Sequence, residues 1–161
     1  MAGRVRVAAY VLLVEDRRLL MCRIAGPEPA AGRWTLPGGG VRFGEEPGAA
    51  AMREVEEETG LLVALDGVAA VTSAVMPARP PERLEPVHAV GILYRGRVVG
   101  GELRPEPDGS TDQAAWIDET RSEGLPVVPV GAAAIRLAFG DPGLSRAPEG
   151  SARQGEPGPQ A

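Results

Sequence analysis

The stretch from Pro47 to Gly60 constrains the fold of this chain most strongly, because its residues favour a helix throughout. Proline fits the first helical position, and glycine fits the residue just past the last turn. Between them lie mainly alanine, glutamate, methionine and arginine, which are good helix formers. The flanking segments read as strands, so the sequence predicts one strong central helix among strands, which is an α/β or α+β arrangement.

Apolar, β-branched runs on both sides of this helix predict the strands. The polar residues at 15–18 form a turn signal, so the first two strands are expected to make a hairpin. Trp34 opens a short strand that is expected to run into a glycine turn at 38–40. The remaining expected elements are strands over 4–14, 19–24, 61–75, 87–99 and 114–117, and a final helix over 129–139.

The length of 161 residues corresponds to one ordinary domain, which we place at 1–140. Residues 141–161 are rich in Pro, Gly, Ser and Gln, and we expect a disordered tail there. No apolar run reaches the eighteen or so residues of a membrane span, and no signal-peptide pattern begins the chain. The single cysteine, Cys22, excludes an internal disulfide. These features predict a cytoplasmic protein without a membrane partner.

Charge is concentrated in one segment. The chain has 22 acidic and 17 basic residues, yet residues 45–58 alone contain six Glu and one Arg. Subtracting that segment leaves 16 acids and 16 bases, so the rest of the chain is neutral. A basic surface for nucleic acid is therefore not expected. An acidic patch on a neutral body instead suggests a site for a cation.

Three of these acids share one helix face. At about 100° per residue, Glu54, Glu57 and Glu58 fall together, and the apolar stripe containing Val55 lies apart from them. Like charges at this spacing repel, and the C-terminal end of a helix disfavours negative charge. A bound Mg²⁺ or Mn²⁺ would relieve both problems, since hard cations take oxygen ligands. The glycines at 38–40 would let the backbone approach such a ligand closely.

The pattern also resembles that of a known family. Gly39, Glu45, Arg53-Glu54-Val55, Glu57-Glu58 and Gly60-Leu61 stand at the spacing of the Nudix box and match it at every position. The resemblance implies an α/β/α sandwich with a mixed sheet. It also implies hydrolysis of a nucleoside diphosphate linked to another group, such as a nucleotide sugar, an ADP-ribose-like compound or a (d)NTP.

The same resemblance implies roles for single residues. Glu54, Glu57, Glu58 and the carbonyl of Gly38 would hold Mg²⁺, for which Mn²⁺ could substitute. Arg53 and Glu45 would pair and fix the preceding loop to the helix. The catalytic set is then Glu45, Arg53, Glu57 and Glu58. The general base would be Glu57 or Glu58, or an acid further along the chain, for which the candidates are Glu102, Glu106, Asp108 and Asp112.

Substrate choice is expected to come from the loops at 25–33, 76–86 and 104–112. We single out Trp34, which could stack on a base, Arg79, which could contact a phosphate, and Asp112. The expected partner is a small nucleoside diphosphate derivative, and the resemblance also allows a homodimer. Two alternatives stay open: a catalytically silent Nudix module that senses a nucleotide, and a structural domain whose acidic helix only aids solubility.

Overall fold

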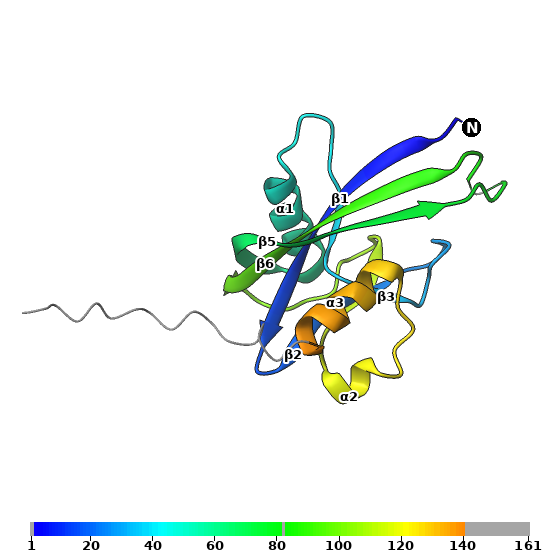
Figure 1. The fold of residues 1–161 in the computed structure, drawn as a ribbon. Coiled ribbons are helices and arrows are strands. Elements are labelled where there is room, and N and C mark those ends of the chain that lie inside the picture. Colours follow the sequence, from blue (N-terminus) through cyan, green and yellow to red (C-terminus); the bar gives the residue numbers. More distant parts are fainter. Residues whose placement is uncertain (1, 82, 141–161) are drawn as a thin grey trace, which may run out of the picture.

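The computed structural model describes residues 2–81 and 83–140, so the tail expected at 141–161 lies outside it. A mixed seven-stranded sheet carries helices on both faces (Figure 1). This is the predicted α/β sandwich. Its elements are β1 (Arg4–Glu15), β2 (Arg18–Ile24), β3 (Trp34–Thr35), β4 (Gly38–Gly40), α1 (Pro47–Thr59), β5 (Leu61–Met76), β6 (Val87–Gly101), β7 (Thr111–Asp118), α2 (Glu119–Ser122) and α3 (Pro129–Phe139).

Strand β1 lies at the centre of the sheet. The main strand order is β3-β2-β1-β6-β5, with β4 paired to β1 and β7 paired to β2. β1 and β6 run parallel, from Arg4 opposite Val87 to Leu13 opposite Gly96. The other strand pairs are antiparallel. The sheet is therefore mixed, as the sequence led us to expect.

Two aliphatic clusters fill the spaces above and below the sheet. On one face, Ala50, Ala51 and Val55 of α1 pack against alternate residues of β1, including Val11. On the other face, the residues of α3 pack with Leu12 and its neighbours. Every helix in the described part of the chain is too short or too polar to cross a membrane.

Helix α1 has the predicted ends. It begins at Pro47 and ends at Thr59, and Gly60 adopts a left-handed conformation with φ 73°. In that conformation the Gly60 N–H donates to the carbonyl of Glu56 across 2.9 Å. Glycine adopts positive φ without a steric penalty, so this residue stops the helix where the site needs it to stop.

The glycine turn expected at 38–40 is instead a strand, β4, which pairs with Ala8, Ala9 and Tyr10 of β1. Glycine permits this pairing because a Cβ at Gly38 would overlap the carbonyl oxygen of Ala9. The short helix α2 was not predicted from the sequence. Its N-cap is Asp118, whose carboxylate accepts the Arg121 N–H at 2.8 Å.

Candidate active site

Strand β4 presents its backbone to helix α1. The Val11 N–H donates to Pro37, and the Val41 N–H donates to Val7. Because hydrogen-bonded and non-hydrogen-bonded positions alternate in an antiparallel pair, the polar backbone groups of Gly38 point away from β1. The Gly38 N–H accordingly donates to Oε2 of Glu58 at 2.9 Å. The strand thereby fixes one carboxylate of the acidic face.

Glu58 is the buried member of that face, with 3% of its surface exposed. Burial raises the pKa of Glu58 to about 8, and the neighbouring charges of Glu54 and Glu106 add to the effect. Hydrogen bonds from Gly38 and from the Ser110 hydroxyl act in the opposite direction but do not offset it. Glu58 is therefore a desolvated acid beside other acids, with no cationic group among the causes of its shift.

Arg53 connects the other acids. Its Nε and Nη2 donate to the two carboxylate oxygens of Glu45 at 2.8 and 3.0 Å. Its Nη1 donates to Glu54 at 2.7 Å and to Glu57 at 3.2 Å. One Arg53 nitrogen thus reaches both Glu54 and Glu57. The charge of Glu54 in turn acts on the pKa of Glu58.

The Arg53–Glu45 pair is also present as predicted. Glu45 additionally accepts the Arg42 N–H at 3.0 Å. The hydrogen bonds from Arg53, followed by the one from Arg42, lower the pKa of Glu45 to about 2. The same contact with Glu45 raises the pKa of Arg53. A charged, bidentate pair of this kind ties the loop between β4 and α1 to the helix.

The donor set of this face suits a divalent cation by its chemistry. Within residues 2–81 and 83–140, no three acidic, His or Cys side chains already surround one point as metal ligands. Glu54 and Glu57 share Arg53 instead. Even so, Glu58 is a buried carboxylate whose neighbours are acids, and clustered carboxylate oxygens are the ligands that Mg²⁺ prefers. A cation bound here would compete with Arg53 for Glu54 and Glu57.

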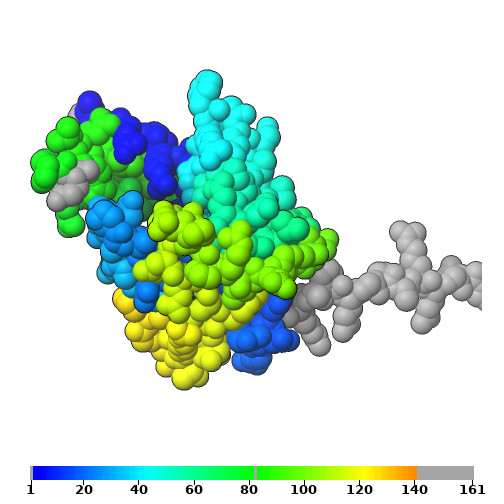
Figure 2. Space-filling view, turned by 180° about the vertical axis from the view of Figure 1, so that it is seen from behind, coloured from blue at the N-terminus to red at the C-terminus, as the bar shows by residue number. Residues whose placement is uncertain are grey.

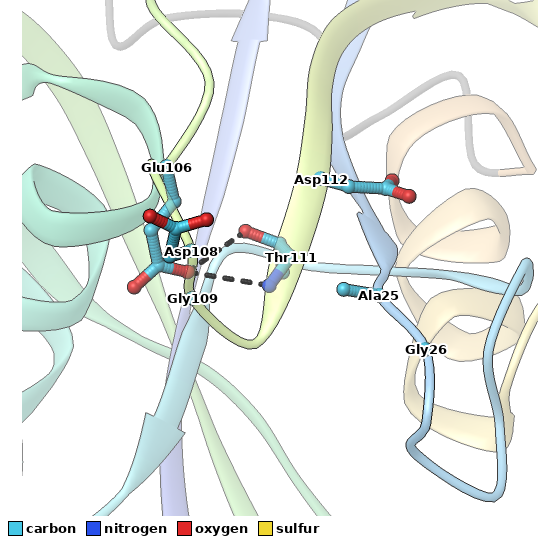
Figure 3. A pocket seen from close by; sticks show the side chains of 7 residues that line it. All are labelled: Ala25, Gly26, Glu106, Asp108, Gly109, Thr111 and Asp112. Atoms are coloured by element: carbon cyan, nitrogen blue, oxygen red, sulfur yellow. Dashed lines mark hydrogen bonds between the residues drawn. The ribbon is translucent and has the colours of Figure 1, made fainter.

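An open cavity of about 440 Å³ is lined by residues on both sides of Ser110, whose hydroxyl donates to Glu58. Segments 25–33 and 104–112 meet there, side by side on the face shown in Figure 2. Glu106 is held at its wall, because the Thr111 N–H and hydroxyl both donate to Glu106 Oε2 at 3.2 Å (Figure 3). A Cβ on Gly109 would overlap that carboxylate. The lining consists of Ala25, Gly26, Glu106, Asp108, Gly109, Thr111 and Asp112.

Glu106 is the downstream acid that the structure connects to the helix. It acts on the pKa of Glu58, whereas Glu102, Asp108 and Asp112 are absent from the causes of that shift. Sequence reasoning named all four acids and missed Ser110, Thr111 and Gly109. No local pattern could have selected them, because Ser110 meets Glu58 across 52 positions of sequence.

Asp112 lines the cavity but turns away from Glu106 (Figure 3). Successive side chains on a strand point to opposite faces, so Thr111 and Asp112 of β7 diverge. The Asp112 carboxylate pairs with Arg23 on the neighbouring strand at 2.7 Å. This contact lowers the pKa of Asp112. Asp112 thus reaches the cavity rim together with a cationic partner.

Trp34 does not have the role expected of it. It is 5% exposed and belongs to the core cluster beneath α3. The Arg121 guanidinium lies 5.7 Å from the centre of its ring, at cation–π distance. A buried ring has no free face for a base, so the stacking role is wrong for this structure.

Arg79 lies in the segment between β5 and β6, where its backbone bridges to Arg83. Among the contacts of the described residues, no hydrogen bond or ion pair joins the Arg79 side chain to the glutamate face. The structure therefore does not bring Arg79 together with the site.

Comparison with known proteins decides the family. The family model described as NUDIX domain matches residues 3–129. The chain belongs to the NUDIX family. The fold agrees, since a MutT NUDIX hydrolase from Burkholderia pseudomallei superimposes with a TM-score of 0.68 at 27% identity. That alignment covers 82% of this chain and 96% of the other.

Two curated relatives carry different activities in their names. An ADP-ribose pyrophosphatase from Methanocaldococcus jannaschii is 33% identical over 102 residues, which cover 63% of this chain and 56% of the relative. An RNA pyrophosphohydrolase from Roseobacter denitrificans is 44% identical over 71 residues, which cover 44% and 41%. The chain thus spans about half the length of these curated relatives.

Proposed function

We propose that this NUDIX chain is a metal-dependent hydrolase that cleaves the pyrophosphate linkage of a nucleoside diphosphate joined to a second group. The observation that carries the proposal is Glu58, a buried carboxyl whose pKa is raised to about 8 beside Glu54 and Glu106. A buried acid whose pKa is strongly raised beside other carboxyl groups is typical of a functional site. A divalent cation would offset the charge of these carboxylates and that of a bound diphosphate.

The proposed metal ligands are Glu54, Glu57, Glu58 and the carbonyl of Gly38. When bound, Mg²⁺ or Mn²⁺ would neutralise phosphoryl charge and lower the pKa of a water molecule. The chain's own contribution is orientation. The Gly38 N–H holds Glu58, and Glu45 holds Arg53, whose guanidinium lies between Glu54 and Glu57.

For the proton acceptor, Glu106 joins Glu57 and Glu58 as a candidate. Thr111 fixes Oε2 of Glu106 with two hydrogen bonds. Its Oε1 accepts no hydrogen bond from the described residues, and the side chain lines the cavity. One fixed oxygen and one free oxygen is a suitable arrangement for a group that must receive a proton from water. Glu58 is less suitable for that role if it is also a metal ligand.

The cavity also favours one kind of second group. Its polar residues are Glu106, Asp108, Thr111 and Asp112, and none of the lining side chains is aromatic. Carboxylates accept hydrogen bonds from hydroxyl groups but repel further phosphates. We therefore propose a hydroxyl-rich group such as a sugar. This agrees with the relative named ADP-ribose pyrophosphatase more than with the relative named RNA pyrophosphohydrolase.

A substrate panel with Mg²⁺ tests the proposal. Product formation is followed by chromatography and mass spectrometry for ADP-ribose, a UDP-sugar, a dNTP, a dinucleoside polyphosphate and a 5′-triphosphorylated RNA. The largest kcat/KM is expected for the sugar-containing compounds. Preference for the RNA would contradict the cavity argument. Nucleotide binding without turnover of any compound would favour the silent-module alternative.

A further inference from the structure

Tyr10 of β1 lies on the side of the sheet opposite α1. Its chain neighbours Ala9 and Val11 belong to the core cluster under α1, and successive side chains of a strand point to opposite faces. Tyr10 packs instead against the cluster under α3, where it is half-buried. Part of this aromatic side chain is therefore accessible from that side of the sheet.

Glycines on the two neighbouring strands make room for the Tyr10 ring. A Cβ at Gly38 of β4 would lie 2.8 Å from Cδ1 of the ring, and one at Gly91 of β6 would lie 3.4 Å from Cε2. Cδ1 and Cε2 are opposite corners of the ring, so the ring leans across the sheet from β1 towards β6. A ring tilted in this way turns one of its broad faces away from the sheet.

The Tyr10 hydroxyl is free. It takes part in none of the hydrogen bonds found within the described residues. Among those residues, Arg83 Nε is the one fully buried side-chain nitrogen or oxygen without a partner, so the Tyr10 hydroxyl reaches solvent. A half-buried aromatic side chain with an accessible polar end is typical of binding surfaces.

Gly38 connects this ring to the glutamate face. The Gly38 N–H donates to Glu58 Oε2 at 2.9 Å, and the Tyr10 ring lies next to the same glycine. Burial raises the pKa of Tyr10, Arg6 lowers it, and the charges of Glu58 and Glu54 raise it further. The ring is thus within electrostatic range of the acids that we propose as ligands of the metal.

Arg6 is the cationic side chain beside the ring. It lies on the same face of β1, and its Nη2 would be 3.5 Å from a Cβ at Gly40. Arg4 is paired with Glu85, whereas none of the ion pairs within the described residues includes Arg6. Because a guanidinium only donates hydrogen bonds, Arg6 is suited to acceptor atoms on a ligand held at the ring.

The other aromatic side chains have different surroundings. Those packed against the two core clusters are Trp34, Tyr94, Trp116 and Phe139. Phe43 is fully exposed, so no neighbouring side chain fixes its ring. Tyr10 is therefore the aromatic side chain that is held in place, partly accessible and close to the glutamate face.

We propose that the nucleobase of the substrate stacks on Tyr10, and that Arg6 donates a hydrogen bond to the base. The inference rests on the proposed function and adds where the nucleoside binds. Aromatic side chains stack on any base, because every base has a π-face. The chemistry of the half-buried ring therefore suits a base better than a sugar or a phosphate.

This placement leaves the cavity for the second group. Glu58 contacts Gly38 through Oε2 and Ser110 through Oε1. Tyr10 lies at Gly38, whereas the cavity is lined by residues on both sides of Ser110. A diphosphate held at Glu58 can therefore have its base on Tyr10 and its second group in the cavity.

Calorimetric titration of the full chain with α,β-methylene-ADP and Mg²⁺ tests this proposal, because the methylene bridge prevents cleavage. Tyr10→Leu is expected to weaken binding by about 10-fold, whereas Tyr10→Phe keeps the ring and should bind like wild type. Tyr94→Leu is the matched control, since Tyr94 is also half-buried but packs under α1. Methylenediphosphonate, which has no nucleoside, should bind wild type and Tyr10→Leu equally. Thermal melts check that each variant is folded.

Three results would overturn the proposal. The first is a folded Tyr10→Leu variant that binds α,β-methylene-ADP as tightly as wild type. The second is a wild type that binds this nucleotide no more tightly than methylenediphosphonate. The third is a Tyr94→Leu variant that loses as much affinity as Tyr10→Leu.

Arg6→Met keeps the proposal testable if Tyr10→Leu does not fold, because Arg6 is exposed. It should weaken binding of α,β-methylene-ADP several-fold and leave methylenediphosphonate unchanged; equal nucleotide binding by Arg6→Met and wild type would overturn the proposal. Failure of the proposed reaction would look different, since ADP-ribose would bind with the same dependence on Tyr10 but would not be cleaved.

Discussion

Gly39 lies directly against the carboxylate of Glu54: a Cβ at Gly39 would be 2.7 Å from the Glu54 carboxyl carbon. Glycine is therefore required at position 39 because a side chain there would collide with Glu54 of the acidic face, and not only because of the conformation of its own strand. Because the opposing group is the end of a flexible side chain, a larger residue would displace Glu54 without preventing folding.

Gly39→Ala should therefore weaken Mg²⁺-dependent turnover by about 10- to 100-fold, as loss of an orienting contact typically does. Its melting temperature should change little. Gly40→Ala is the matched control, because a Cβ there meets only the Arg6 side chain at 3.5 Å. Mg²⁺ titrations of the hydrolysis rate compare the two variants. Equal rates for both would show that the Glu54 contact has no effect on the site.

The raised pKa of Glu58 predicts that this residue destabilises the metal-free protein as the pH rises. Its pKa rises from 4.5 to about 8 on folding, so the folded state keeps a proton that the unfolded state has lost. The contribution of Glu58 to stability therefore falls as pH increases from about 4.5 to 8. Glu58→Gln removes this cost and should be more stable than wild type at pH 8.5, by on the order of a few kcal/mol.

Urea unfolding in EDTA between pH 5 and pH 9 measures this difference. The gap between Glu58→Gln and wild type should widen with pH and then level off above the folded pKa. Parallel profiles would mean that Glu58 titrates normally in the folded state.

For Glu45 we predict the opposite pH dependence, because its contribution to folding stability falls as the pH decreases. Its pKa falls from 4.5 to about 2 because Arg53 and the Arg42 N–H bind the charged form. The stabilisation is fully present above about pH 4.5 and is lost as the pH falls towards 2. Glu45→Gln should therefore melt at a lower temperature than wild type at pH 7, with the difference shrinking in acid. Glu46→Gln is the control, since Glu46 is exposed and forms none of the ion pairs found in the described residues.

A side chain at position 109 is expected to displace the Glu106 carboxylate. Alanine at 109 would push the Glu106 carboxylate from its place beside Thr111. If Glu106 accepts the proton, Gly109→Ala and Glu106→Gln should both lower kcat, by about 100-fold or more for the latter, with little change in KM. Gly124→Ala is the control, because no atom lies within 4 Å of a Cβ there. A normal kcat for Glu106→Gln would return the role of base to the glutamates of α1.

The sequence predicts well what is determined by local spacing. The ends of α1 follow from Pro47 and Gly60, and the face of three glutamates follows from helical periodicity. The Arg53–Glu45 pair could be predicted from the resemblance to the Nudix box, because both residues lie in that continuous motif.

Contacts between distant segments were beyond the sequence. The pairing of β4 with β1 and the meeting of Glu58 with Ser110 depend on how the whole sheet assembles. Trp34 was misassigned because an aromatic residue beside a glycine run does not show whether its ring faces a ligand or the core. The parallel register of β1 and β6 is likewise encoded by no local pattern.

The most direct test of the whole account is the steady-state turnover of ADP-ribose with Mg²⁺ by Glu57→Gln, Glu58→Gln and Glu56→Gln. The three variants make the same chemical change on adjacent residues of α1, and Glu56 is exposed outside the shared face. The account predicts a loss of at least about 100-fold in kcat for the first two and normal turnover for Glu56→Gln. Near-wild-type turnover by both Glu57→Gln and Glu58→Gln would contradict it.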